Sequence, residues 1–445
     1  MRKFDIVEVS FVFKREEIMD KHSNEIGKLP AVLQRFLHYV DFETASDIDS
    51  QSAPSTASQL VLGRELVREL LSLGVTDARM SPEGVVTGSI PASRGCEDCP
   101  AIGFIAHMDT SPEAKGGPVN WRIVRYQGKD IVLDAEKEIL LSRERFPELD
   151  RYHGQDLVVT DGHTLLGADD KAGIAAIMTM VDVVTSHPDM PHAKICIAFT
   201  PDEEVGRGTE NFDIQGFGAD YAYTVDGGEL GELNSETFCA AIATVTMRGV
   251  SVHPGSAKNK MVNALRLVMH LMNSMPADEV PEKTEGYEGF YHPIRVEGGV
   301  EEATLLMLIR DHDRRRFESR KAALQAREAE YNSYGEGTCT ISIKEQYLNM
   351  QEYLQDVPAV MELARAAYRA AGITPRERPI RGGTDGARLS ERGLPCPNLF
   401  TGGLNFHGIY ECLPVESLEK SAEVTIRLAE LSARMQSLSE PPALL

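Results

Sequence analysis

The sequence has no hydrophobic run long enough to span a membrane. No stretch of about eighteen apolar residues occurs among its 445 residues, and charges interrupt residues 1–14 too often for the apolar part of a signal peptide. We therefore expect a soluble protein of the cytoplasm.

Basic residues are scarce relative to acidic ones. The chain has 46 Lys and Arg against 68 Asp and Glu, which gives a formal net charge of -22. Nucleic acids and anionic membranes bind clusters of Lys and Arg. We therefore expect neither a nucleic acid nor a membrane as a partner.

Cysteines are few, and a serine-nucleophile motif is lacking. Seven cysteines, an odd number without a secretion signal, indicate reduced thiols rather than a disulfide framework. Cys96 and Cys99 form a C-x-x-C pair, but no second pair or suitably spaced histidines follow, which indicates a surface loop rather than a zinc knuckle. No G-x-S-x-G motif of serine hydrolases occurs.

The sequence does contain a repeated pattern of short apolar strands and helices. We predict an α/β fold with a mixed, largely parallel sheet flanked by helices, built from residues 1–236 and 351–445. Residues 1–28 of this larger domain are expected to be an N-terminal extension. Residues 237–350 have the element order β-α-β-β-α-β, which predicts an inserted ferredoxin-like α+β domain.

Hydrophobic periodicity predicts the individual elements. The expected helices are residues 29–40, 57–73, 174–184, 261–273, 313–331, 358–371 and 415–435. The expected strands are residues 101–106, 194–199, 221–225, 238–248, 292–297, 303–310 and 338–343, with a strand pair in 78–90. Residues 119–157 are charged, and we expect them to be irregular.

Two adjacent glutamates, Glu203 and Glu204, directly follow the expected strand 194–199 in the stretch T-P-D-E-E-V-G-R-G. Open α/β sheets hold their chemistry at such strand ends. Neighbouring side chains diverge as they leave a strand, so one carboxylate can bind a metal while the other faces a water that the metal activates. An isolated acidic triplet is more often a solvated turn, so this interpretation depends on the rest of the chain.

A histidine and an aspartate follow another expected strand, 101–106. His107 and Asp109 share a face because they are two residues apart in an extended segment. The carboxylate can then accept one imidazole N–H while the other nitrogen binds a metal.

Further candidate ligands also lie at strand or helix ends. Asp169 ends a glycine-flanked turn and can face a cleft, whereas Asp170 fits an ordinary helix cap. Asp226 closes the expected strand 221–225, and His407 lies in a glycine-rich loop near the C-terminus.

The collected candidate ligands are two histidines and three carboxylates, namely His107, Asp169, Glu204, Asp226 and His407. Such a set, without a thiolate, suits a pair of divalent cations that share one carboxylate. We therefore predict a two-metal hydrolytic centre with Glu203 beside it.

Six motifs of the chain resemble the peptidase T family. They are A-H-M-D-T-S-P, L-G-A-D-D-K-A-G, T-P-D-E-E-V-G, V-D-G-G, R-G-G-T-D-G-A and T-G-G-x-N-x-H-G, and the resemblance covers residues 30–435. Peptidase T enzymes are cytosolic bacterial aminotripeptidases among the di-zinc exopeptidases, which also include carboxypeptidase G and succinyl-diaminopimelate desuccinylase.

The resemblance implies that each subunit binds two Zn²⁺ ions. The implied ligands are His107 and Asp226 for one ion, Glu204 and His407 for the other, and Asp169 as a bridge. The family pattern also implies a cis peptide bond after Asp169.

The resemblance also implies the catalytic residues. Asp109 would orient His107. Glu203 would act as the general base that takes a proton from the water and returns it to the leaving amine.

Four residues of the inserted domain or near it are candidate substrate contacts. The resemblance identifies the segment around His253 as a lid whose histidine stabilises the developing oxyanion. Arg310 and Arg381 stand at a strand end and in a loop, where each can clamp a peptide carboxylate, although such arginines are more often surface residues. Asn263 is a further possible contact.

We therefore expect a zinc-dependent aminopeptidase that releases the N-terminal residue of tripeptides, and by analogy a homodimer joined through the lid domain. A carboxypeptidase or amidohydrolase for another small amide is the alternative, because fold and metals do not determine the substrate. A non-catalytic binding module is a second alternative, against which the retained Glu203 argues. Tyr410 departs from the family pattern, which has a second histidine there, and we expect an effect on substrate fit rather than on zinc binding.

Overall fold

The computed structural model describes residues 12–14 and 28–440, and these divide into two compact units. The first unit comprises the chain up to Asn234, then Tyr353–Arg378, and the chain from Arg392 onward. The second unit comprises Ser235–Glu352 and Pro379–Glu391. The segment Pro379–Glu391 therefore belongs to the second unit, whereas the sequence predicts it to be part of the larger α/β domain.

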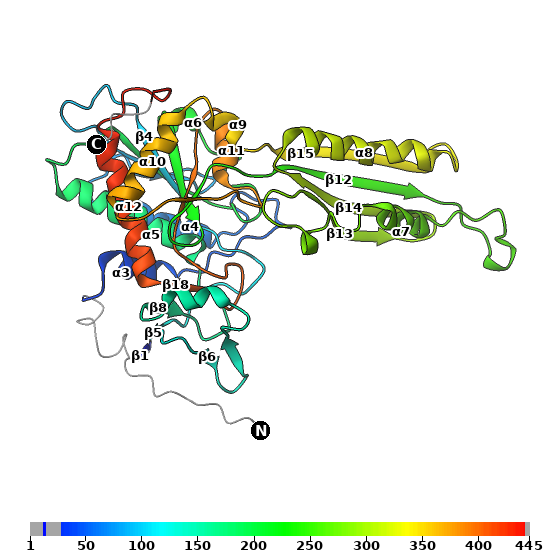
Figure 1. Cartoon of the computed structure of the whole chain (residues 1–445), viewed down its shortest axis with the longest axis horizontal. Coiled ribbons are helices and arrows are strands. Elements are labelled where there is room, and N and C mark those ends of the chain that lie inside the picture. The colour runs from blue at the N-terminus through cyan, green and yellow to red at the C-terminus, as the bar shows by residue number, and fades with distance from the viewer. Residues whose placement is uncertain (1–11, 15–27, 441–445) are drawn as a thin grey trace. The chain divides into compact units, whose positions relative to one another are not determined.

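The first unit is built around a sheet of eight strands (Figure 1). In spatial order these are β16 (Arg376–Glu377), β11 (Glu232–Asn234), β17 (Asn398–Phe400), β10 (Tyr221–Gly227), β4 (Ile102–His107), β9 (Ile195–Thr200), β3 (Val86–Ile90) and β2 (Arg79–Met80). The four central strands β17, β10, β4 and β9 are mutually parallel, and β3 and β11 flank them in antiparallel orientation. The predicted mixed α/β fold is confirmed.

The central strands are buried because their sequences are short uninterrupted apolar runs. All six residues of β4 and all six of β9 are buried. Strands covered on both faces have this pattern in parallel sheets. Because β17, β10, β4 and β9 run in one direction, their carboxyl ends lie at a single edge of the sheet.

Helix α5 (Ala168–Ser186) packs directly on β4 and β10. The helix can come close to the sheet because residue 173 is glycine. A Cβ added there would lie 1.9 Å from the carbonyl oxygen of Val225. Helices α3 (Ala31–Tyr39) and α12 (Val415–Ser432) pack on α5, and α10 (Pro358–Ala370) packs on α12. Helix α4 (Gln59–Ser72) covers β2 and β3, and the short α6 (Ile214–Phe217) lies beside β9.

The prediction that residues 119–157 are irregular is wrong. Strands β5 (Arg122–Arg125) and β8 (Asp156–Val159) form an antiparallel sheet with β1 (Val12–Lys14) and β18 (Cys412–Pro414). Strands β6 (Ile131–Asp134) and β7 (Ile139–Leu141) form a hairpin. The strands are three or four residues long and several end in charged residues, so no hydrophobic period marks them. Strand β1 lies within the predicted N-terminal extension, whose other residues up to 27 are outside the described part of the chain.

The second unit has the predicted order β-α-β-β-α-β. Its elements are β12 (Cys239–Arg248), α7 (Ala264–Ser274), β13 (Phe290–Gly298), β14 (Glu302–Asp311), α8 (Arg314–Asn332) and β15 (Cys339–Tyr347). The strands are antiparallel in the order β13-β14-β12-β15. Alternate residues of β14 are buried, and both α7 and α8 pack against β12 and β14. The short helices α9 (Gln351–Leu354) and α11 (Asp385–Glu391) complete the unit, except that α9 continues into the first unit at Tyr353.

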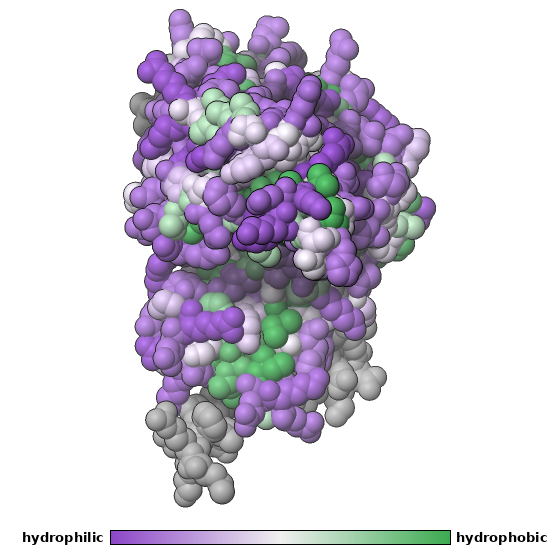
Figure 2. All heavy atoms as spheres, turned by 90° about the vertical axis from the view of Figure 1, so that its right-hand side faces the viewer, coloured by the Kyte–Doolittle hydropathy of each residue, from purple (hydrophilic) through white to green (hydrophobic). Residues whose placement is uncertain are grey.

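All seven cysteines of the chain are unpaired. Within residues 12–14 and 28–440, no helix has the length and apolar character needed to cross a membrane. The face drawn in Figure 2 is largely hydrophilic, and its apolar residues gather in a few separate patches.

Candidate metal centre

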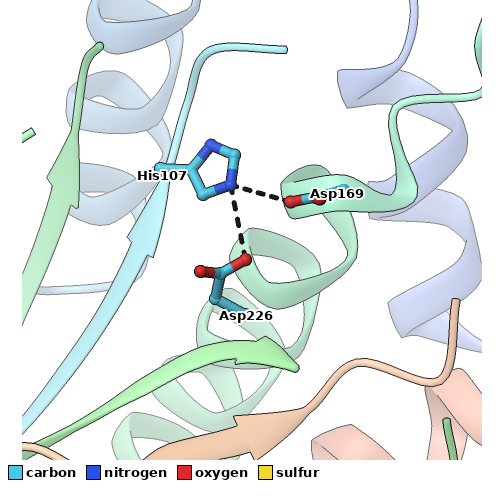
Figure 3. A group of neighbouring side chains, drawn as sticks. All are labelled: His107, Asp169 and Asp226. Carbon is cyan, nitrogen blue, oxygen red and sulfur yellow. Dashed lines mark hydrogen bonds and ion pairs between the residues drawn. The ribbon is translucent and has the colours of Figure 1, made fainter. Parts of the chain in front are cut away.

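The five predicted ligands lie close together in the first unit, and four of them come from the sheet edge where the parallel strands end. His107 is the last residue of β4, and Asp226 is the penultimate residue of β10. Glu204 lies in the turn after β9, and Asp169 stands in the first turn of α5, where its backbone is not helical. His407 comes from the loop after β17. Figure 3 shows His107, Asp169 and Asp226 pointing toward one another from three separate elements.

The first ligand group is His107, Asp169 and Asp226. The Nε2 atom of His107 lies 2.8 Å from Oδ1 of Asp169 and 3.4 Å from Oδ1 of Asp226. One ligand atom from each residue lies within 4.8 Å of the others, which is the spacing of side chains around one cation. The imidazole of His107 is 2 % exposed, whereas Asp169 and Asp226 are partly exposed.

The second ligand group is Asp169, Glu204 and His407. The Nε2 atom of His407 lies 3.0 Å from Oε2 of Glu204 and 3.3 Å from Oδ2 of Asp169. These ligand atoms also lie within 4.8 Å of one another. Asp169 therefore offers Oδ1 to the first group and Oδ2 to the second, as a bridging carboxylate does.

The electrostatics of the cluster favour bound cations. Burial raises the pKa of Asp226 to about 7, and the charge of Asp169 adds to this. Burial and then the charge of Asp169 raise the pKa of Glu204. Hydrogen bonds to Asp169 and Glu204 raise the pKa of His407 to about 11. A nearby divalent cation would therefore favour the ionised forms of Asp226 and Glu204.

The donor set fits two divalent cations. Each group combines one imidazole with carboxylates, the ligand types that zinc and similar ions accept. Oε1 of Glu204 is buried, and no described residue is a hydrogen-bond partner for it. A buried carboxylate oxygen without a hydrogen-bond partner destabilises the folded protein unless a cation or an ordered water contacts it.

Asp109 has a different set of contacts from those predicted. Its carboxylate Oδ1 accepts the backbone N–H of Glu203 at 2.9 Å, and Oδ2 accepts that of Glu204 at 3.1 Å. The Nδ1 atom of His107 is closer to the backbone carbonyl of Asp109, at 3.0 Å, than to its carboxylate, at 3.4 Å. Asp109 thus contacts His107 chiefly through its backbone carbonyl, and its carboxylate ties the end of β4 to the turn that carries both glutamates.

Two buried carboxylates that hold the ligands were not predicted. Asp170 accepts the N–H of Gly173 at 3.1 Å, which is the helix-capping bond that the sequence predicts. It also accepts the N–H of His107 at 3.1 Å. Glu411 accepts the backbone N–H groups of Leu166 at 2.7 Å, Gly167 at 2.8 Å and Asp169 at 3.1 Å. The only sequence signal for Glu411 is its place four residues after His407.

The loop of His407 has a left-handed backbone. The φ angles of Asn405 and His407 are 59° and 62°. Nδ1 of His407 lies 3.4 Å from Oε2 of Glu113, which gives the imidazole an acidic partner on the side away from Glu204. Tyr410, the departure from the family pattern, packs against Phe146 with ring centroids 5.2 Å apart.

The four predicted substrate contacts all lie in the second unit. His253 accepts the N–H of Gly255 through Nδ1, and Asn263 caps α7 by accepting the N–H of Arg266. Arg310 donates through Nη1 to the carbonyls of Ala241 and Ile309.

Arg381, the fourth of these residues, is tied into the second unit. Its Nη1 donates to the carbonyls of Gly286 and Glu288, and its Nη2 donates to Oγ1 of Thr284. Its guanidinium also lies 5.2 Å from the ring centroid of Phe238. Whether any of the four contacts a substrate stays a prediction.

Comparison with known proteins identifies the family. Residues 158–431 match the family described as peptidase family M20/M25/M40. The chain is 50% identical over 403 residues to a peptidase T of Parabacteroides distasonis, which covers 91% of this chain and 99% of that protein. It is 51% identical over 411 residues to a peptidase T of Desulfitobacterium hafniense, which covers 92% and 100% of the two chains.

Solved structures share the fold. The aminopeptidase PepT of Bacillus cereus superposes with a TM-score of 0.70 at 24% identity and covers 91% of this chain and 98% of its own. The YXEP protein of Bacillus subtilis, described as a dinuclear metal-binding peptidase of the M20 family, has a TM-score of 0.58 at 13% identity, over 90% of this chain and 97% of its own. The chain therefore belongs to peptidase family M20/M25/M40, as a metallo-exopeptidase of the peptidase T group.

Proposed function

We propose that the protein is a zinc-dependent aminopeptidase that removes the N-terminal residue of tripeptides. The observation that carries the proposal is the position of Asp169, whose two oxygens each face one histidine-containing group. Glu203 lies next to Glu204 on the same turn, where a proton acceptor is needed. The name peptidase T of the relatives supports the peptide substrate.

The proposed chemistry is hydrolysis by an activated water. When bound, two divalent cations supply Lewis-acid polarisation of the scissile carbonyl and lower the pKa of a water. Glu203 accepts a proton from the attacking water and passes it to the leaving amine, a contribution typically of about 10²–10⁴-fold. Asp109 supports this step by holding the backbone of Glu203 and Glu204.

We propose that the second unit acts as a lid that recognises both ends of a short peptide. In this proposal His253 stabilises the oxyanion, Arg310 or Arg381 binds the C-terminal carboxylate, and Asn263 assists. Both arginines already donate to acceptors of the second unit, Arg310 to two carbonyls through Nη1 and Arg381 to three acceptors, and we test Arg310 first because it has fewer such acceptors. We expect Arg310→Lys to raise KM for a tripeptide acid and to leave KM for the same tripeptide amide unchanged. Equal effects on both substrates would exclude Arg310 as the carboxylate contact.

We also propose a cytoplasmic homodimer joined through the second unit. The seven unpaired cysteines suit a reducing compartment. Strand β13 is at the edge of its sheet, and Val296 on this strand is 43% exposed. Edge strands with exposed apolar residues commonly pair with another chain. Light scattering should show a dimer that Val296→Glu weakens, whereas Val132→Glu, a change at a similarly exposed valine (45%) of the first unit, should leave it intact.

The function is tested by metal analysis combined with a peptide series. We expect about two zinc equivalents per chain and loss of hydrolysis after chelation, with recovery when zinc is added back. Tripeptides should be cleaved in preference to dipeptides and tetrapeptides, and N-acylated tripeptides should be resistant. A preference for the blocked peptide would favour an amidohydrolase instead, and full activity of a metal-free preparation would exclude the proposed chemistry.

The proposed base is tested by replacing Glu203 with Ala. Activity should fall by about 10²–10⁴-fold while the zinc content stays near that of the native enzyme, because Glu203 is not in either ligand group. Glu204→Ala is the matched variant on the same turn, and it should lose metal as well as activity. If Glu203→Ala retained activity, another residue would have to be the base.

A further inference from the structure

We propose that Asp202, fixed by Ser55 and by Gln59 at the start of α4, is a positioning residue for Glu203. The inference rests on the proposed function, because it matters only if Glu203 transfers the proton. Asp202 is 3% exposed and directly precedes Glu203 in the turn after β9.

The Asp202 carboxylate is held by a buried cluster from a distant part of the chain. Oδ2 accepts the backbone N–H of Ser55 at 2.7 Å, and Oδ1 accepts the Nε2–H of Gln59 at 2.8 Å and the hydroxyl of Ser55. Oε1 of Gln59 accepts the backbone N–H of Asp202 at 3.1 Å. Gln59 is fully buried and Ser55 is 6% exposed, so water does not compete for these bonds.

The backbone of Asp202 also depends on this cluster. Its φ angle is 60°, in the left-handed region that residues other than glycine, asparagine and aspartate rarely adopt. The turn continues with hydrogen bonds from the N–H of Arg207 to the carbonyl of Asp202 at 2.9 Å, and from the N–H of Gly206 to that of Glu203 at 2.6 Å. The side-chain bonds of Asp202 thus hold a backbone conformation that sets the direction of the next side chain.

The Glu203 backbone is consequently fixed from two sides. Asp109, at the end of β4, accepts the N–H of Glu203, and the cluster of Ser55 and Gln59 holds the preceding residue. The Asp202 carboxylate also faces a cation, Nη2 of Arg207, at 3.5 Å. A buried ion pair is by itself weak evidence of a stabilising role. We therefore assign the bonds between Asp202, Ser55 and Gln59 the role of positioning Glu203, the proposed proton acceptor.

The test replaces Asp202 with Asn, which keeps the tendency toward a left-handed backbone but places an amide donor where an acceptor is needed. We expect kcat for a tripeptide to fall about 10- to 100-fold, as small misplacements of catalytic groups do. KM should change less than about threefold and the zinc content should be unchanged, because substrate and metal ligands are untouched. Gln59→Leu, which removes the partner instead, should have the same signature.

Asp220→Asn is the matched control. Asp220 also accepts a backbone N–H, that of Ala101 at 2.7 Å, but at the opposite end of β4. Its replacement should leave kcat unchanged. Should Asp202→Asn fold poorly, Ser55→Ala removes one donor to Asp202, together with the acceptor of the Asp47 N–H and one of the acceptors of Gln59, and keeps the bonds of Asp202 to Gln59 and to the Ser55 N–H, so a smaller loss of kcat at unchanged KM is expected.

The outcomes separate this inference from the proposed function. If Glu203→Ala is inactive but Asp202→Asn, Gln59→Leu and Ser55→Ala all have native kcat, the positioning role is wrong and the function stands. If these variants lose thermal stability without losing kcat per folded molecule, the cluster is only structural. If Glu203→Ala is active, the proposed base is wrong, and the positioning role fails with it.

Discussion

Replacing Glu411 with Gln should weaken metal binding although Glu411 is in neither ligand group. The side chain is 2% exposed, and its two oxygens accept three backbone N–H groups in the loop that leads to Asp169. In the Glu411→Gln variant the side-chain carbonyl oxygen can keep the two bonds from Leu166 and Gly167. The new amide nitrogen then faces the N–H of Asp169, so that one donor is left without an acceptor.

The magnitude follows from those bonds. Leaving one buried N–H unsatisfied costs about 1–3 kcal/mol. Asp169 belongs to both ligand groups, so a displaced Asp169 affects both ions. Loss of a group that orients a ligand typically costs 10–100-fold in metal affinity, so we expect a 10- to 100-fold rise in the zinc dissociation constant.

The assay is competition for zinc against a chromophoric chelator, measured together with thermal unfolding of the metal-free protein. Glu69→Gln is the control, because Glu69 is also hydrogen-bonded within the first unit, to Nε of Arg35 at 2.8 Å and to the hydroxyl of Tyr39 at 2.5 Å. It should lower stability without changing zinc affinity. Equal zinc affinity of Glu411→Gln and the native protein, within about twofold, would refute the reasoning.

Three further predictions concern the close contacts of α5 and the loop after His407. Gly173→Ala should destabilise the protein by about 3 kcal/mol or more in denaturant unfolding, because the new Cβ would meet the carbonyl of Val225 at 1.9 Å, and a near-native midpoint would contradict this packing. Burial lowers the pKa of Lys171 to about 8 from an ordinary 10.5, so between these values the unfolded chain binds more protons. The stability of the native protein relative to Lys171→Met should therefore rise with pH across that window in urea titrations, and a fall would mean that the sign is wrong. Tyr410→His should change KM for tripeptides without changing zinc content, and a loss of zinc would show that residue 410 affects the metal site rather than substrate fit alone.

The ligand positions could be predicted because the ends of buried parallel strands can be recognised in the sequence, where a short apolar run stops. His107, Asp226 and the pair Glu203 and Glu204 each follow a short apolar run, and one edge of the sheet collects them. Asp169 was recognisable because it follows a glycine-containing turn and precedes a strongly apolar helix. These signals are local, so they do not require knowledge of the packing.

The supporting contacts could not be predicted, because they join residues far apart in the sequence. Glu411 and the amides of the loop before Asp169 are more than 240 residues apart, and a carboxylate that accepts backbone N–H groups has no sequence pattern of its own. The same holds for Gln59 and Asp202. The strands within residues 119–157 were missed for a different reason, since three- or four-residue strands are too short to show a period.

The ligand set is divided by the second unit, which has a consequence for the order of biosynthesis. His107 and Asp226 precede that unit in the chain, and His407 follows it. A ribosome that has translated the first ligand group must still translate the whole second unit before it reaches His407. During that interval the nascent chain carries every residue of the first ligand group but lacks His407 and Glu411, so the full set of ligands and their support is present only once residue 411 has been translated.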